Sequence, residues 1–136
     1  MNLTSLVTDN ITDLLVKIVK FTQLRQKTLT NNINNINQHG FTPKDLEVDK
    51  FSSLLDTAIN EHIQNQRLVL CDTENIKFST SGNFEIEPII DEHAKQLFES
   101  NRDQYLELQI NKLLENSLNQ KVAAQLLQQK KAMSQI

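Results

Sequence analysis

The side chains best suited to metal binding are few and scattered in this chain of 136 residues. Three histidines occur, at positions 39, 62 and 93, and no two of them are four residues apart. His62 follows Glu61 and His93 follows Glu92, but neither pair belongs to the HExxH pattern that places two zinc-binding histidines on one helix face. The sequence therefore predicts no metal site.

The other reactive groups also lack the sequence context that catalysis needs. Cys71 is the only cysteine, which excludes an intrachain disulfide, and no basic residue adjoins it to stabilise a thiolate. Gly40 and Gly82 are the only glycines, which excludes a glycine-rich phosphate loop. Acidic pairs at 85/87 and 91/92 could serve as an acid–base site, but on polar segments they are more often solvent-facing. We therefore expect no enzymatic activity and no cofactor. A hydrolase built on Glu87 or Asp91 is the least favoured alternative.

The most distinctive stretch is residues 25–45, RQKTLTNNINNINQHGFTPKD. Leu29, Ile33 and Ile36 recur at helical spacing, with five asparagines between and after them. Asparagine is a poor helix former, so this helix needs a partner along its apolar face. Gly40 supplies the left-handed conformation common after a helix end, and Pro43 prevents the helix from restarting. Composition alone would instead suggest a low-complexity polar tract, since 28 of the 136 residues are Asn or Gln.

The order of residues in this stretch resembles the motif of bacterial flagellar rod proteins, most closely the proximal rod proteins. That motif runs RQ-x-x-L-x-x-NIAN-x-x-TPG[YF]-x-x-x-D. Three positions depart from it, namely Asn34 for Ala, Gln38 for Thr and His39 for Pro, and the last of these affects the turn. The matching residues are Arg25, Gln26, Leu29, Asn32, Ile33, Asn35, Gly40, Phe41 and Asp45.

A second match to the same family lies at the C-terminal end. Residues from about 105 to the end predict one helix with an apolar stripe, formed by Leu106, Ile110, Leu113, Leu114, Leu118, Val122, Leu126, Leu127 and Met133. Gln120 stands where the family has a Tyr. The residues that correspond to the family pattern are Asn101, Asp103, Leu106, Glu107, Leu113, Glu115, Asn116, Leu118, Gln125, Leu126, Leu127, Lys130 and Ile136.

The N-terminal end predicts another long helix, over residues 1 to about 38. Its stripe repeats at spacings of 4, 3, 4 and 3, close to the coiled-coil period, through Val7, Ile11, Leu14, Ile18 and Phe21. A helix of roughly thirty residues spans about 45 Å. Such a helix cannot wrap a compact core, so it needs a partner along its whole length.

The middle of the chain is predicted to be shorter and more varied. Residues 51 to about 62–65 predict a short amphipathic helix, and Asp91 is a candidate N-cap for another helix ending near Phe98. Residues 68–70, 76–78 and 84–87 are short strand candidates, the last two separated by a turn at 81–83. They predict either a small hairpin or an extended segment.

Length, composition and charge limit the possible roles. With 38% hydrophobic residues the chain can build one domain of two or three helices. The net charge of −3 disfavours nucleic acid as a partner. Residues 1–40 and 104–136 each carry four basic and two acidic groups, whereas residues 41–103 carry six basic and thirteen acidic groups. Solvated faces without special meaning would also give this pattern.

The fold class we predict is mainly α. Long terminal amphipathic helices, within 1–40 and 101–136, pack as an antiparallel coiled-coil-like pair, and the variable acidic segment 41–100 contributes a short helix and a small irregular or β region. A two-helix pair buries only part of each stripe. Surplus apolar positions should therefore contact neighbouring subunits, and they are Leu15, Val19, Leu114 and Leu127.

The resemblance implies a structural subunit of the flagellar basal-body rod, part of the drive shaft for motility. Its implied partners are other rod subunits, the adaptor protein between export gate and rod, and the type III export apparatus, without lipid insertion. The start of the chain lacks the features of a cleaved signal peptide, and no apolar run reaches the ~18 residues of a membrane span. The expected location is the periplasm-spanning rod, reached by flagellar export.

The residues expected at the assembly interface are those of the two motifs, with their asparagine amides bonding backbone groups of neighbours. They are Arg25, Gln26, Leu29, Asn32, Ile33, Asn35, Gly40, Phe41, Asp45, Asn116, Leu118, Leu126 and Leu127. We expect a loosely ordered monomer that becomes rigid on polymerisation. The alternative is a cytosolic helical-hairpin adaptor or secretion chaperone, which should be a compact dimer.

Overall fold

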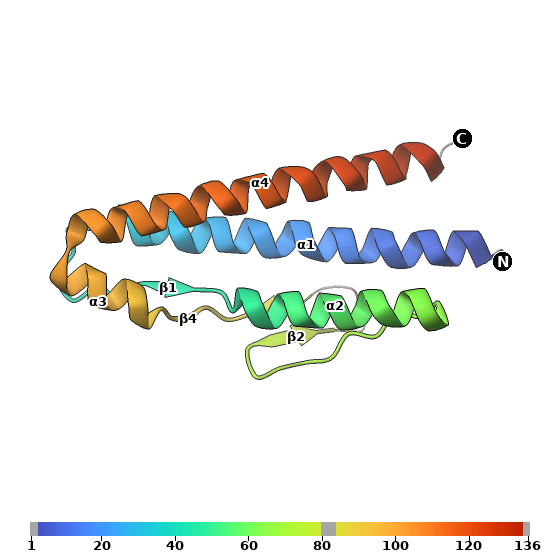
Figure 1. Ribbon diagram of the computed structural model, residues 1–136, viewed down its shortest axis with the longest axis horizontal. Coiled ribbons are helices and arrows are strands. Elements are labelled where there is room, and N and C mark those ends of the chain that lie inside the picture. The colour runs from blue at the N-terminus through green and yellow to red at the C-terminus, as the bar shows by residue number, and fades with distance from the viewer. Residues whose placement is uncertain (1–2, 80–83, 135–136) are drawn as a thin grey trace.

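Two long helices form the body of the protein. The computed structural model describes residues 3–79 and 84–134. Helix α1 spans Leu3–Asn34 (32 residues) and helix α4 spans Arg102–Ser134 (33 residues). They pack together, most closely at the end away from the chain termini (Figure 1). At 1.5 Å rise per residue each is about 50 Å long. The two long terminal helices are therefore confirmed, as is the prediction that they pack together.

The apolar stripe of α1 faces inward, as its spacing predicts. Leu14 and Phe21 are buried, and Ile11 and Ile18 are half-buried. Val7, the first residue of the predicted stripe, lies outside the residues whose side chains are described. Leu29, which follows the last residue of this stripe by eight positions, is fully buried. The helix ends four residues earlier than predicted, and residues 35–37 continue it as turns.

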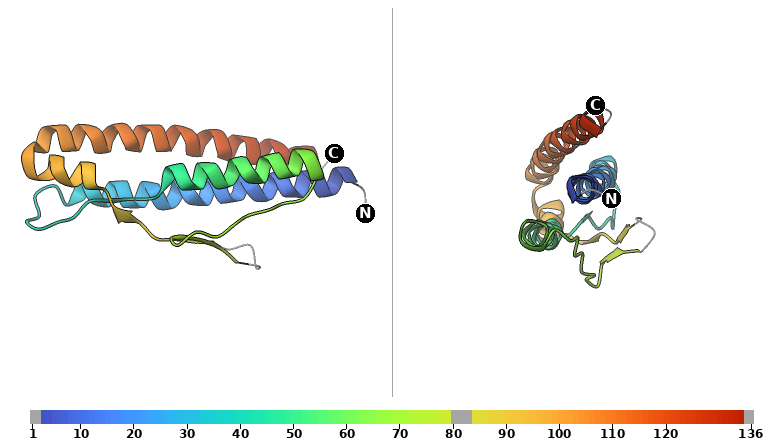
Figure 2. Two further views of the ribbon diagram at one scale, coloured as in Figure 1. Left: turned by 60° about the horizontal axis from the view of Figure 1, so that its bottom comes forward. Right: turned by 90° about the vertical axis from the view of Figure 1, so that its right-hand side faces the viewer.

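Helix α2, Val48–Asn65, lies along α1 and is held there by aromatic packing. The rings of Phe21 and Phe51 stack with centroids 4.1 Å apart, and Phe51 and Phe84 stack at 6.1 Å. Leu46 and Ile76 complete this buried cluster. Viewed along the long axis, α2 and α4 flank α1 on two sides (Figure 2). The short amphipathic helix predicted in this region is confirmed.

Two small antiparallel sheets connect the helices. Strand β1 (Lys44–Asp45) pairs with β4 (Ile89–Ile90), and β2 (Ile76–Phe78) pairs with β3 (Phe84–Ile86). The second pair is the predicted hairpin, although its 81–83 turn lies outside the described residues. Residues 68–70 were predicted as a strand and have no regular structure; none of the described strands pairs with them.

Helix α3, Glu92–Ser100, packs on the beginning of α4. The Asp91 side chain accepts a hydrogen bond from the backbone N–H of Ala94 at 3.1 Å, which confirms the predicted N-cap. Ala94, Phe98 and Tyr105 form a second buried cluster. This cluster closes the end of the helix pair opposite the termini.

Helix α4 faces α1 with a different side from the one its leucines predict. The buried residues on α4 are Tyr105, Gln109, Asn116 and Ala123, at spacings of 4, 7 and 7. Much of the predicted apolar stripe is instead 42–67% exposed, at Ile110, Leu114, Leu118, Val122, Leu126 and Met133. The prediction failed because apolar periodicity presumes that the leucines fill the contact between the helices. Here hydrogen-bonded amides and small side chains fill it.

Candidate functional site

The motif residues meet in a buried polar seam where α1, β1 and α4 come together. Arg25 on α1 donates from Nε to Asp45 Oδ1 at 3.0 Å and from Nη2 to Asp45 Oδ2 at 3.1 Å. The backbone N–H of Leu46 donates to Asp45 Oδ1 at 2.7 Å. A forked contact of this kind fixes both position and orientation of the carboxylate. The pair fixes strand β1 on the long helix.

Lys112 extends this ion pair to the opposite helix. Its Nζ donates to Asp45 Oδ2 at 3.1 Å and to Asp91 Oδ2 at 2.6 Å. Asp91 is also the N-cap of α3, so a single lysine of α4 joins β1 to the start of α3. With Arg25, the network holds two cations and two carboxylates. This balance of charge is what a partly buried site requires.

The charges in this network shift the pKa values of its members. Burial by itself would raise the pKa of the Asp45 carboxyl, but the hydrogen bonds and charge of Arg25, with those of Lys112, outweigh it and lower the pKa. Burial would likewise lower the pKa of the Lys112 amine, but the contacts with Asp91 and Asp45 raise it. Both shifts favour the charged forms.

A second part of the seam is built from amides. Asn32 donates from Nδ2 to the Lys44 carbonyl at 2.7 Å and to Gln109 Oε1 at 3.0 Å, and the Lys44 N–H donates to Asn32 Oδ1 at 3.2 Å. The Tyr105 hydroxyl donates to the Asn32 carbonyl at 2.9 Å. Burial, and then the charge of Asp91, raise the pKa of Tyr105 to about 12. Asn32 therefore links α1 to both β1 and α4.

One more amide continues the seam towards the chain termini. Asn116 Nδ2 donates to the Thr22 carbonyl at 2.7 Å, and both residues are buried. The predicted role for the asparagines was to bond backbone groups of neighbouring subunits. Asn32 and Asn116 instead bond backbone groups of their own chain. Asn35 is the exception, since its amide reaches only Asn31 in the same helical turn.

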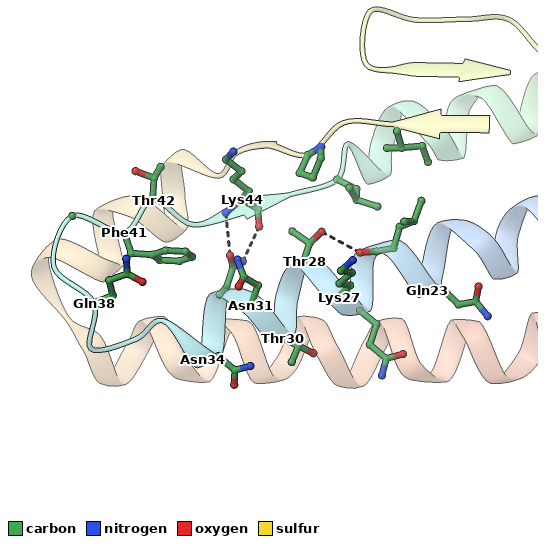
Figure 3. A pocket seen from close by; sticks show the side chains of 17 residues that line it. Gln23, Lys27, Thr28, Thr30, Asn31, Asn34, Gln38, Phe41, Thr42 and Lys44 are labelled. Carbon is green, nitrogen blue, oxygen red and sulfur yellow. Dashed lines mark hydrogen bonds between the residues drawn. The ribbon is translucent and has the colours of Figure 1, made fainter. Parts of the chain in front are cut away.

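An open polar groove of about 1110 Å³ runs beside this part of α1. Figure 3 shows it between α1 and the segment that carries Phe41, Thr42 and Lys44. Its lining is dominated by amides, hydroxyls and lysines rather than by carboxylates or nucleophilic groups. Such a surface suits hydrogen bonding to a neighbouring backbone or to polar side chains. Its amide side chains are those of Gln23, Gln26, Asn31, Asn32, Asn34 and Gln38.

A second groove, of about 410 Å³, is apolar and lies between α1, α2 and α4. Leu15, Ile18 and Phe21 of α1 form its floor. Its walls are Val48, Phe51 and Leu55 of α2, and Leu118, Val122 and Leu126 of α4. The α4 wall is 46–62% exposed, so the groove is open to solvent along that helix.

The structure separates the predicted interface residues into inner and outer groups. Arg25, Leu29, Asn32, Asp45 and Asn116 are buried within the chain. Ile33, Asn35, Phe41 and Leu127 are half-buried, and Phe41 packs edge-on against Phe98. The exposed ones are Gln26, Gly40, Leu118 and Leu126.

The four apolar positions predicted to contact neighbouring subunits also differ in their exposure. Leu114 is 65% exposed, whereas Leu15 is only 9% exposed and lies in the floor of the apolar groove. Val19 and Leu127 are half-buried. Gly40 adopts φ +76°, the left-handed conformation predicted for it.

Sequence reasoning missed Thr22, Tyr105, Gln109 and Lys112. The last three share a signal with Asn116, because 105, 109, 112 and 116 follow the same 4, 3, 4 spacing as the stripe of α1. A search for that period without regard to polarity would have found them. Which partners they bind depends on contacts remote in sequence and could not be read.

The described residues contain no group of three or more His, Cys, Asp or Glu side chains arranged to hold a metal ion. His39 and His93 are exposed, and the buried His62 lies 3.4 Å from the Asn10 amide. Within residues 3–79 and 84–134, no helix has the length and hydropathy of a membrane span.

No family model, curated protein or solved structure matches this chain. The interpretation of the site therefore depends on its geometry and on the motifs in the sequence.

Proposed function

We propose that this protein is a structural subunit of the bacterial flagellar basal-body rod, of the proximal type. Its terminal helices would act as an antiparallel coiled-coil-like pair and polymerise with rod neighbours after type III export. The observation that carries the proposal is the exposed apolar stripe of α4, which the chain's own fold leaves uncovered. Large exposed apolar surfaces mark sites of protein association.

The position of the motif residues supports this role. Arg25 and Asp45, twenty residues apart, form the forked ion pair, and Asn32 and Asn116 tie α1 to β1 and α4. In this arrangement the motif fixes how α1, β1 and α4 pack together, and the apolar stripe is left to contact others. A load-transmitting shaft needs both properties. Its partners would be rod subunits, the adaptor below the rod and the export apparatus.

The test is deletion of the gene in its host bacterium, with a tagged copy supplied in its place. We expect the deletion strain to lose swimming and to lack rods beyond the inner-membrane ring in isolated basal bodies. The tagged copy should restore both and co-purify with basal bodies. Normal swimming with intact rods in the deletion strain would overturn the proposal.

A cytosolic adaptor or secretion chaperone remains the second candidate, because the apolar groove between α2 and α4 could also receive a client helix. Sedimentation of dilute purified protein separates the two roles. A rod subunit should be monomeric and melt over a broad range, whereas a chaperone should be a compact dimer with a sharp transition.

A further inference from the structure

The apolar groove between α2 and α4 is a site where a further helix would pack against α1, α2 and α4 together. Helices α2 and α4 flank α1 (Figure 2). The groove between them has residues of α1 as its floor. Its α2 wall continues beyond Leu55 at spacings of four, through Ile59 and Ile63, which are 43% and 70% exposed. A helix with an apolar ridge would therefore find matching surface on three sides.

The chain itself presents a ridge of this kind on the outer side of α4. Leu114 and Leu118 are four residues apart and are 65% and 62% exposed. They project away from the face that carries Gln109 and Asn116 and meets α1. We define this pair as the outer ridge. It adjoins the face of α4 that carries Val122 and Leu126 and lines the groove, and Leu118 belongs to both surfaces.

The charges beside the ridge and the groove are complementary. After Glu115 the chain contains only basic charged residues, and Lys121 lies next to the outer ridge. Helix α2 carries Asp49 and Asp56, both exposed. Asp56 is one turn beyond Ser52, which lines the groove, so its carboxylate lies on the groove rim.

The other charges of α2 have partners within the chain. Lys50 pairs with Glu47 at 2.8 Å, and Glu61 pairs with Arg67 at 2.6 Å. The rim therefore presents Asp56 as its negative charge, and an incoming helix with a basic flank is favoured over an acidic one.

We propose that the occupant of the groove is a second copy of this chain, whose outer ridge enters with Lys121 beside Asp56. This inference names the subunit contact of the proposed structural role and rests on it. The contact joins the ridge of one copy to the groove of another, and the two surfaces share Leu118 of α4. Contacts between unlike surfaces form rings where the rotation closes and open filaments where it does not.

Charge reversal tests the contact by sedimentation velocity over a series of protein concentrations. Asp56→Lys and Lys121→Glu should each weaken self-association by about tenfold, because each places like charges together. The double variant should recover it. An equal mixture of the two single variants should also recover it, since every groove then has a ridge of opposite charge available.

The control is Lys77→Glu, an exposed charge on β2 that does not line the groove, which should leave association unchanged. A geometric check uses Asp56→Cys and Lys121→Cys in separate chains, each also carrying Cys71→Ser. Mild oxidation of their mixture should yield the mixed disulfide in excess over either homodimer. A mixture in which Lys77→Cys replaces Asp56→Cys should not yield the mixed disulfide in excess.

Three results would overturn the inference. They are a wild-type chain that stays monomeric at all concentrations, single variants that associate as the wild type does, and a groove that instead binds a foreign basic amphipathic peptide without self-association. None of these affects the deletion test. If the wild-type chain enters rods while the Asp56→Lys and Lys121→Glu variants self-associate as the wild type does, this contact is contradicted. The proposed rod role is then unaffected.

Discussion

Asp45 receives more side-chain contacts than any other residue described above. Its carboxylate accepts hydrogen bonds from Arg25, Lys112 and the Leu46 N–H. Removing one partner of a buried ion pair leaves the other charges without compensation, at a cost of about 3 kcal/mol. Asp45→Asn should therefore lower the free energy of unfolding by about that amount in urea titrations. Glu107→Gln, an exposed change on α4, should alter it by less than about 0.5 kcal/mol.

The same carboxylate predicts how stability depends on pH. The pKa of Asp45 is lower in the folded chain than its ordinary 3.8. Its contribution is therefore complete above about pH 4 and declines as the pH falls through the lower folded-state pKa. Unfolding measured between pH 2 and pH 6 should show this acid loss in the wild type and much less of it in Asp45→Asn. Equal acid sensitivity of the two proteins would contradict this assignment.

Two asparagines of one motif should behave differently. Asn32 is buried and makes three hydrogen bonds through its side chain, so Asn32→Ala should cost about 3 kcal/mol. Asn35 bonds only within its own helical turn, so Asn35→Ala should change stability by less than about 0.5 kcal/mol. Thermal melts of the two variants make the comparison. A large loss in Asn35→Ala together with a small one in Asn32→Ala would contradict the seam.

Single residues were partly predictable because local rules govern some of them. The left-handed Gly40 and the N-cap Asp91 follow from backbone geometry within a few residues. The pairing of Arg25 with Asp45, and of Asn32 with Gln109, joins positions 20 and 77 residues apart. Nothing in the local pattern specifies such partners. The motif could therefore be recognised in the sequence, but the hydrogen-bond partners of its residues could not be predicted.

At the scale of elements, α2 depends on a few aromatic rings for its place. Phe51 is 3% exposed and stacks on both Phe21 and Phe84. Phe51→Ala should cost about 3–5 kcal/mol and raise hydrogen exchange in α2 and β3 more than in α4. Phe98→Ala, in the other cluster, should instead affect α3 and the start of α4. Exchange mass spectrometry on both variants tests this, and identical patterns would contradict separate clusters.

Helix existence was predictable and helix orientation was not. Apolar residues recurring at helical spacing identified both long helices, because this pattern depends on the sequence alone. The face that α4 turns to α1 is set by Tyr105, Gln109 and Asn116, each of which forms a hydrogen bond with a residue of α1. Apolar periodicity carries no information about such pairs. For the same reason the β1–β4 pairing, between residues 44–45 and 89–90, was not foreseen.

Across the whole molecule, burial is concentrated at the end opposite the termini. Tyr105, Gln109 and Asn116 of α4 are almost fully buried, whereas after Ala123 the described part of α4 contains no buried residue. Amide protection should therefore fall along α4 from residue 105 towards residue 134. Hydrogen exchange at two protein concentrations tests this. Protection of the last three turns should rise at the higher concentration if copies cover one another, and uniform protection at both would contradict the gradient.

The amides between α1 and α4 have one more consequence. If α4 slid along α1 by a single turn, Gln109 would lose Asn32 and Asn116 would lose the Thr22 carbonyl. Each buried polar group left without a partner costs about 1–3 kcal/mol. A contact made of leucines alone would tolerate the same displacement at little cost. These hydrogen bonds therefore favour one alignment of α1 and α4. If the two helices first pair out of alignment, the unpaired amides favour a shift to the correct one.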